Sequence, residues 1–144
     1  MFKRILVPTD GSDITQKAVD ASIRLAGSLG AEIHTICVKE PFPYGAISEM
    51  QPTPPQEFFD AQERIAARHV AVVIEACAAA GVPCHGVSVE GLHPWEAIID
   101  HAKRTDCDLL VMASHGRRGV SALLLGSETQ KVLTHTKIPV LVVR

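Results

Sequence analysis

Asp108–Val132 reads D-L-L-V-M-A-S-H-G-R-R-G-V-S-A-L-L-L-G-S-E-T-Q-K-V, and this stretch decides the predicted fold. It opens with an unbroken apolar run, Leu109–Met112, which is too short for a typical helix and typical of a strand buried on both faces. A loop of small and polar residues follows, and a segment that can be helical begins near Glu128. A buried strand, a Gly/Ser loop and a helix start together present backbone N–H groups to an anion, so the stretch predicts a phosphate-binding loop.

Charged side chains inside this loop favour the anion interpretation. Arg117 and Arg118 add fixed positive charge that suits phosphate, and His115 can donate one hydrogen bond even when neutral. The alternative is an ordinary strand-to-helix connection whose glycines only relieve backbone strain.

Short apolar strands alternate with amphipathic helices along the rest of the chain. Strands are predicted at 5–7, 31–38, 84–89, 109–112 and 138–143, and helices at 13–29, 57–80, 94–105 and 128–134. This order predicts an α/β fold, a three-layer sandwich in which a five-stranded parallel sheet carries helices on both faces. At 144 residues the chain fits a single domain, 1–144.

Helix ends and helix faces follow from local patterns. Ser12 is expected to cap the first helix, and Gly30 is expected to end it. In that helix the predicted core face is Ile14, Ala18, Ala21, Leu25 and Leu29. In the second helix the predicted stripe is Phe58, Ala61, Ile65, Val72, Ala76 and Ala79, widened by Ala66, Val70, Val73, Cys77 and Ala80.

Residues 39–56 break the alternation. Five prolines fall within this stretch, and neither a helical nor a strand period is visible. A loop of this length in a compact domain is usually functional or disordered, so we expect either a mobile excursion or a cover over a site.

The predicted topology brings two distant segments together. Ligands of open parallel sheets bind beyond the carboxyl ends of the strands, where the strand order reverses, and the first and fourth strands would flank that point. Asp10 and the loop 113–116 would then share one edge of the sheet. Asp10 could accept hydrogen bonds from ribose hydroxyls or hold a metal ion on a phosphate, or simply cap its turn. Val38 could contact a base, or be core.

Composition and missing motifs exclude several classes of protein. A net charge of −2 gives no global basic field, so no nucleic-acid partner is expected. The four cysteines form no C-x-x-C pair and are interpreted as reduced thiols of a cytoplasmic protein. No apolar run approaches the ~18 residues of a membrane span or forms a signal peptide, so no membrane association is expected.

Catalytic and metal motifs are also missing from the sequence. There is no P-loop, no G-x-G-x-x-G after the first strand, no H-E-x-x-H and no Cys/His cluster. A response-regulator receiver would need a phosphoacceptor Asp where this chain has Ser88-Val89-Glu90. No Ser-His-acid arrangement or other general base is legible, so no catalytic residue and no metal site are predicted.

Over essentially its whole length the chain resembles the universal stress protein family. Nucleotide-binding members carry G-x-x-G, nine residues, then G-[ST]. Here Ala113-Ser114-His115-Gly116, nine residues and Gly126-Ser127 match that spacing, with Ala113 in place of the first glycine. The opening I-L-V-P-T-D-G-S and the closing K-I-P-V-L-V-V-R also resemble the family's ends.

The resemblance implies ATP or a related adenine nucleotide as ligand, with magnesium as a candidate ion. The implied binding residues are Pro8, Thr9, Asp10, Val38, Met112, Ala113, His115, Gly116, Arg117, Gly126, Ser127 and Glu128. Two of them depart from the family pattern. Ala113 adds a methyl group where the backbone should approach phosphate, and Glu128 places an anion beside Ser127, where it would oppose phosphate unless a cation intervenes.

The last predicted strand, 138–143, suggests a homodimer. As the final strand it should lie at an edge of the sheet, and two-fold pairing with a second copy would cover this apolar edge. We therefore expect a dimeric stress-response or signalling factor. A dimeric interaction module with a degenerate nucleotide site and, below it, a slow ATPase or phosphotransferase are the alternatives.

Overall fold

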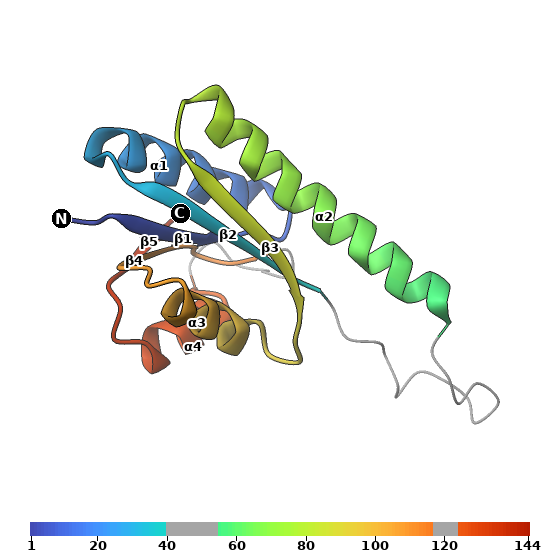
Figure 1. The fold of residues 1–144 in the computed structure, drawn as a ribbon. Helices are drawn as coiled ribbons and strands as arrows, with labels where there is room; N and C mark the ends of the chain where they lie inside the picture. The colour runs from blue at the N-terminus through green and yellow to red at the C-terminus, as the bar shows by residue number, and fades with distance from the viewer. Residues whose placement is uncertain (40–54, 117–123) are drawn as a thin grey trace.

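A computed structural model describes residues 1–39, 55–116 and 124–144. The elements are β1 (Arg4–Pro8), α1 (Asp13–Leu29), β2 (Glu32–Lys39), α2 (Gln56–Ala79), β3 (Cys84–Glu90), α3 (Pro94–Arg104), β4 (Leu109–Ala113), α4 (Ser127–His135) and β5 (Val140–Val143). The strands form one parallel sheet in the order β3-β2-β1-β4-β5, as Figure 1 shows. The predicted three-layer α/β class is therefore confirmed, and the expected elements are all present, with bounds that differ only at their ends.

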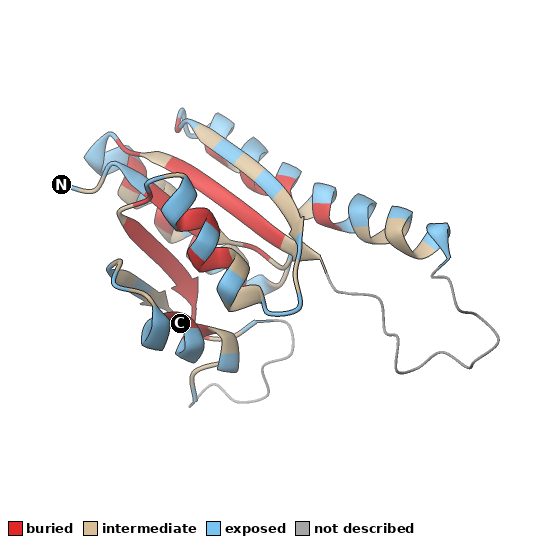
Figure 2. Ribbon diagram, turned by 60° about the horizontal axis from the view of Figure 1, so that its bottom comes forward, coloured by how far each residue is buried: buried red, intermediate tan, exposed pale blue. Residues whose placement is uncertain are grey.

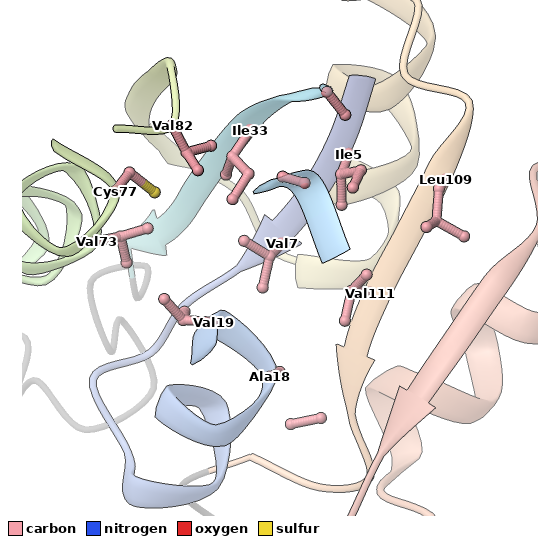
Figure 3. Close-up of a cluster of buried hydrophobic side chains, with 13 residues drawn as sticks. Ile5, Val7, Ala18, Val19, Ile33, Val73, Cys77, Val82, Leu109 and Val111 are labelled. Carbon is pink, nitrogen blue, oxygen red and sulfur yellow. The ribbon is translucent and has the colours of Figure 1, made fainter. Parts of the chain in front are cut away.

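Alternate residues of the central strands face different helical layers. Ile5 and Val7 of β1 pack with α1 and α2, whereas Leu6 between them packs with α3 and α4. Figure 3 shows the first of these clusters, in which strands β1, β2 and β4 meet the two helices. β4, which lies between β1 and the edge strand β5, is buried along its whole length, as the apolar run 109–112 predicted, and Figure 2 colours such buried strand residues red.

The ends of α1 agree with the sequence. The Oγ of Ser12 accepts a hydrogen bond from the Thr15 amide at 3.3 Å, which caps the first turn. Gly30 adopts φ = 65° at the C-cap, a left-handed conformation that favours glycine. The predicted core face is only partly right, because Ala18 is buried whereas Leu29 is 41% exposed.

The predicted principal stripe of α2 is wrong. Ile65 and Val72 are 45% and 46% exposed, and the buried residues are those expected only to widen the stripe: Ala66, Val70, Val73 and Cys77. A close approach to β3 explains the rotation. A Cβ on Gly86 of β3 would lie 2.4 Å from Cγ1 of Val70, so this glycine admits the Val70 side chain.

Two segments predicted from the sequence need separate mention. Most of the Pro-rich stretch 39–56 lies outside the described residues, and its described ends belong to β2 and α2. β5 pairs only with β4 and forms one edge of the described sheet, as predicted. No helix in the described ranges has the length and apolar character needed to cross a membrane.

Candidate functional site

The strand order reverses between β1 and β4. β1 pairs with β4 through Ile5–Leu109 and Leu6–Leu110, and from there the chain continues to β2 on one side and to β5 on the other. The loops that leave β1 and β4 therefore diverge at the carboxyl edge of the sheet, as predicted. In parallel sheets of this kind, that divergence is where ligands bind.

The turn after β1 is held by its own side chains. The backbone amide of Thr9 donates to the carbonyl of Ile36 at 2.9 Å, which ties the turn to β2. Oδ1 of Asp10 accepts from the Ser12 amide at 2.9 Å and from Oγ1 of Thr15 at 3.0 Å. The turn-capping role considered for Asp10 is thus present, and these bonds hold its carboxylate at the sheet edge.

Asp10 also meets the loop that follows β4. A Cβ placed on Gly116 would lie 2.8 Å from Oδ2 of Asp10, so the two segments approach closely here and a side chain at residue 116 would displace the Asp10 carboxylate. The structure therefore brings together two predicted site residues separated by more than a hundred positions.

The residues directly after β4 lie against the start of α4. Ser114 donates its amide to the Val143 carbonyl at 2.8 Å and accepts from the Gly126 amide at 2.7 Å. Its hydroxyl lies 3.1 Å from Nδ1 of His115. Ser114 was not among the predicted binding residues. The sequence contained a signal for this role, because Ser114 is a small polar residue that directly follows the buried strand.

Glycine at position 126 permits this contact. A Cβ there would lie 3.0 Å from Cα of His115 and 3.3 Å from its Cβ. The backbone of Gly126 has φ = −62° and ψ = 153°, a conformation open to any residue, so close approach and not a left-handed turn explains the glycine.

Ala113 fits its position despite its extra methyl group. The residue is buried in the core cluster on the α1 side of the sheet, and its carbonyl accepts from Oγ1 of Thr129 at 2.8 Å. It has no positive φ, so nothing in its backbone requires the glycine common in the family. The fold therefore accommodates the methyl group of Ala113 in the core, while its effect on phosphate binding stays a prediction.

The first turn of α4 offers backbone donors to an anion. The helix spans nine residues, and its N-cap residue is Gly126, so no side-chain hydrogen bond at the N-cap, within the described residues, occupies the first N–H groups of the helix. The first N–H groups of a helix have no partner within it and carry partial positive charge. Ser127 is exposed at this start, so its hydroxyl is available beside these amides.

Glu128 has a partner that the sequence did not suggest. Its Oε2 accepts from the Trp95 amide at 2.9 Å and so caps the N-terminus of α3. The indole of Trp95 stacks near the His135 ring, with centroids 4.3 Å apart. Together these contacts tie α3 to α4. From the sequence, this carboxylate was expected only to oppose a phosphate beside Ser127. The structure shows that it also faces the partially positive N-terminus of α3.

The remaining predicted residues occupy different environments. Met112 is buried between the sheet and the layer of α3 and α4, and Val38 packs against the same cluster. Val38 is only partly buried, so this packing leaves part of its surface accessible to a base. Pro8 ends β1 and is half-buried. Arg117 lies outside the described residues.

A cavity of about 270 Å³ lies at a different place, lined by Lys39, Phe59, Glu63 and Glu90 among others. Lys39 Nζ is 2.6 Å from Oε2 of Glu63, and this ion pair holds the pKa of Glu63 below its ordinary range. The acidic lining suits a phosphate poorly. Within the three described ranges, no group of three or more His, Cys, Asp or Glu residues is arranged to hold a metal ion.

Comparisons with known proteins agree with this architecture. The family model described as the universal stress protein family matches residues 1–144. A Thermus aquaticus relative, "Universal stress protein in QAH/OAS sulfhydrylase 3'region", is 35% identical over 144 residues and covers all of both chains.

Two solved structures share the fold. One is the structure of hypothetical protein MJ0577, with a TM-score of 0.84, 26% identity and coverage of 99% of this chain and 96% of that one. The other, a universal stress protein in complex with cAMP, has a TM-score of 0.69, 26% identity and coverage of 99% and 97%. With its motif, its fold and a match over all 144 residues, the chain belongs to the universal stress protein family.

Proposed function

We propose that this universal stress protein binds an adenine nucleotide, with ATP as the expected ligand, at the sheet edge between β1 and β4. The observation that carries the proposal is the convergence of the Asp10 turn, Gly116 and the start of α4 without a side-chain cap. The relative solved with cAMP supports an adenine nucleotide as the ligand class.

The residues divide into three roles. The N–H groups at the start of α4 and the hydroxyl of Ser127 would bind phosphate oxygens. The carboxylate of Asp10 would accept hydrogen bonds from ribose hydroxyls, while Val38 and Met112 would contact the base.

Magnesium would enter with the phosphates. Mg²⁺ keeps several waters and takes one or two carboxylates plus phosphate oxygens, and Asp10 would supply one such carboxylate as the alternative to its ribose role. The ion would reduce the negative charge of a triphosphate near Glu128.

We also propose a homodimer paired through β5 within 138–143. β5 is an edge strand, and Leu141 in its middle is 42% exposed. Pairing with the same strand of a second copy would satisfy both edges by one self-complementary contact. A nucleotide bound at the carboxyl end of the neighbouring β4 would then lie next to the dimer interface. We propose that the dimer acts in the cytoplasm as a stress-response or signalling factor.

Calorimetry with ATP, ADP, AMP, cAMP and GTP, with and without magnesium, tests the nucleotide proposal. We expect adenine nucleotides to bind at micromolar to millimolar concentrations and Gly116→Val and Ser127→Ala to weaken binding. Ser28→Ala is the matched control, because the Ser28 hydroxyl donates a hydrogen bond within α1, to the Arg24 carbonyl at 3.0 Å, away from the proposed site. Wild-type protein that binds none of these ligands at millimolar concentration would exclude the proposal and leave the interaction module in its place.

A further inference from the structure

The end of α2 and the start of β3 bring two cysteines together. Cys77 lies in the last turns of α2, and Cys84 is the first residue of β3. The chain reverses between them through Gly81 at φ = 70°, and the Val82 amide donates to the Cys77 carbonyl at 2.9 Å. The Pro83 carbonyl then accepts from Ile33 at 2.8 Å, which fixes the start of β3 against β2.

The two thiols differ in exposure but belong to one environment. Cys77 is fully buried in the core cluster between α2 and the sheet, where Figure 3 shows its sulfur. Cys84 is half-buried and packs against that same cluster. Both residues are free cysteines.

The two thiol side chains also interact by a hydrogen bond. A hydrogen bond from Cys84 lowers the pKa of Cys77, and the same contact together with burial raises the pKa of Cys84. The two thiols are therefore in direct contact across the turn, which is the arrangement that disulfide formation requires.

We propose that Cys77 and Cys84 are a modification site that forms a reversible intramolecular disulfide under oxidation, covalently joining α2 to β3. The disulfide would close a short loop across a turn that backbone hydrogen bonds already hold in place. The proposal is independent of nucleotide binding, because this turn precedes β3 and lies at the amino edge of the parallel sheet, opposite the edge that carries Asp10 and Gly116.

A peroxide is the oxidant that fits this environment, since it is small enough to reach a half-buried thiol. One thiolate sulfur of the pair attacks a peroxide oxygen, the O–O bond breaks, and the departing hydroxide takes a proton to become water. The resulting sulfenic acid is attacked by the second thiol, the S–O bond breaks, and a second water leaves with the disulfide formed. A dithiol reductant reverses the modification by thiol–disulfide exchange.

The other two cysteines provide internal controls. The sulfur of Cys37 lies 3.9 Å from Nδ1 of His69, and that of Cys107 lies 3.2 Å from Oγ1 of Thr105. Burial raises the pKa of Cys107, which suppresses its thiolate. We therefore expect Cys107 to stay alkylatable under mild oxidation.

Peptide mass spectrometry tests the proposal directly. Trypsin leaves Cys77 and Cys84 in a single peptide, 69–103, which contains no Lys or Arg before its end and no other cysteine. The folded protein is treated with mild hydrogen peroxide and then alkylated in denaturant. We expect the mass of this peptide to be lower by two hydrogens and the peptide to carry no alkyl group. After treatment with dithiothreitol, both thiols should again be alkylatable. Cys107→Ser should behave like wild type, whereas Cys84→Ser should lose the lighter species.

Thermal unfolding of the same samples provides the second measurement, and the oxidised protein should unfold at a higher temperature than the reduced protein. Retention of two alkylatable thiols in the peptide would overturn the proposal. So would oxygen addition to either cysteine without the lighter species, or a disulfide between two chains.

Discussion

Replacing Gly126 by alanine tests whether close loop packing holds the start of α4. The new Cβ would lie 3.0 Å from Cα of His115 and 3.5 Å from the Ser114 carbonyl oxygen. These neighbours include backbone atoms, so relief requires a shift of the loop or of the helix start, and the short 2.7 Å hydrogen bond from the Gly126 amide would lengthen.

The expected magnitude combines opposing terms. Overpacking costs about 1–3 kcal/mol, and alanine is also a poorer N-cap than glycine by some tenths. In the opposite direction, alanine lowers the conformational entropy of the unfolded chain, which stabilises the folded protein by about 0.4–1 kcal/mol. The backbone at Gly126 is open to alanine, so no conformational strain is added. The net loss of about 1–2 kcal/mol should lower Tm by about 2–8 °C.

Gly27→Ala provides the matched control for the same chemical change. Gly27 lies within α1, and nothing lies within 4 Å of a Cβ placed there. Alanine is the better helix former by up to about 1 kcal/mol, so this variant should raise Tm.

Thermal unfolding by circular dichroism and calorimetric titration with ATP should be measured on both variants. We expect Gly126→Ala to lower both Tm and ATP affinity, and Gly27→Ala to leave affinity unchanged. A Gly126→Ala protein with a raised Tm and wild-type affinity would refute the packing argument.

Three further outcomes are expected. Glu128→Ala removes the acceptor of the Trp95 amide, so the free energy of unfolding measured in urea should fall by about 0.5–2 kcal/mol, while ATP affinity should rise. Unchanged stability would show that the α3 cap contributes nothing. Burial lowers the pKa of His101, and the charges of His34 and Arg104 lower it further. Neutral His101 therefore contributes to the free energy of unfolding above about pH 6.5, and this contribution is lost as the pH falls through the pKa of the folded protein. His101→Gln should make stability fall less steeply with decreasing pH, and an equally steep fall in the variant would contradict this role. Leu141→Lys should give monomers in sedimentation at tens of micromolar, whereas Lys at the exposed Leu92 should leave the dimer intact; a wild-type monomer would contradict the proposed pairing.

Local patterns predicted most of the fold because each depends on nearby residues. The apolar run of β4, the Ser12 cap and the Gly30 stop have local causes, and all three are present. The buried face of α2 failed because two overlapping apolar stripes were available. The choice between them depends on Gly86, a residue of another element that admits Val70.

The candidate site was predictable in outline but not in its contacts. Alternation of strands and helices was enough to place Asp10 and the loop after β4 at one edge. The bond from Trp95 to Glu128 joins residues 33 positions apart on two helices, and no sequence period encodes it. Ala113 appeared unfavourable by family pattern, yet its tertiary packing accommodates the methyl group.

Titration of isotopically labelled protein with ATP and magnesium, followed by amide resonances, tests the central claim most directly. We predict saturable shifts concentrated at Asp10, Ser114–Gly116 and Ser127, with Gly27 and Gly81 unaffected. A spectrum unchanged at millimolar ATP, or shifts confined to the cavity lined by Lys39 and Glu63, would contradict a nucleotide site between β1 and β4.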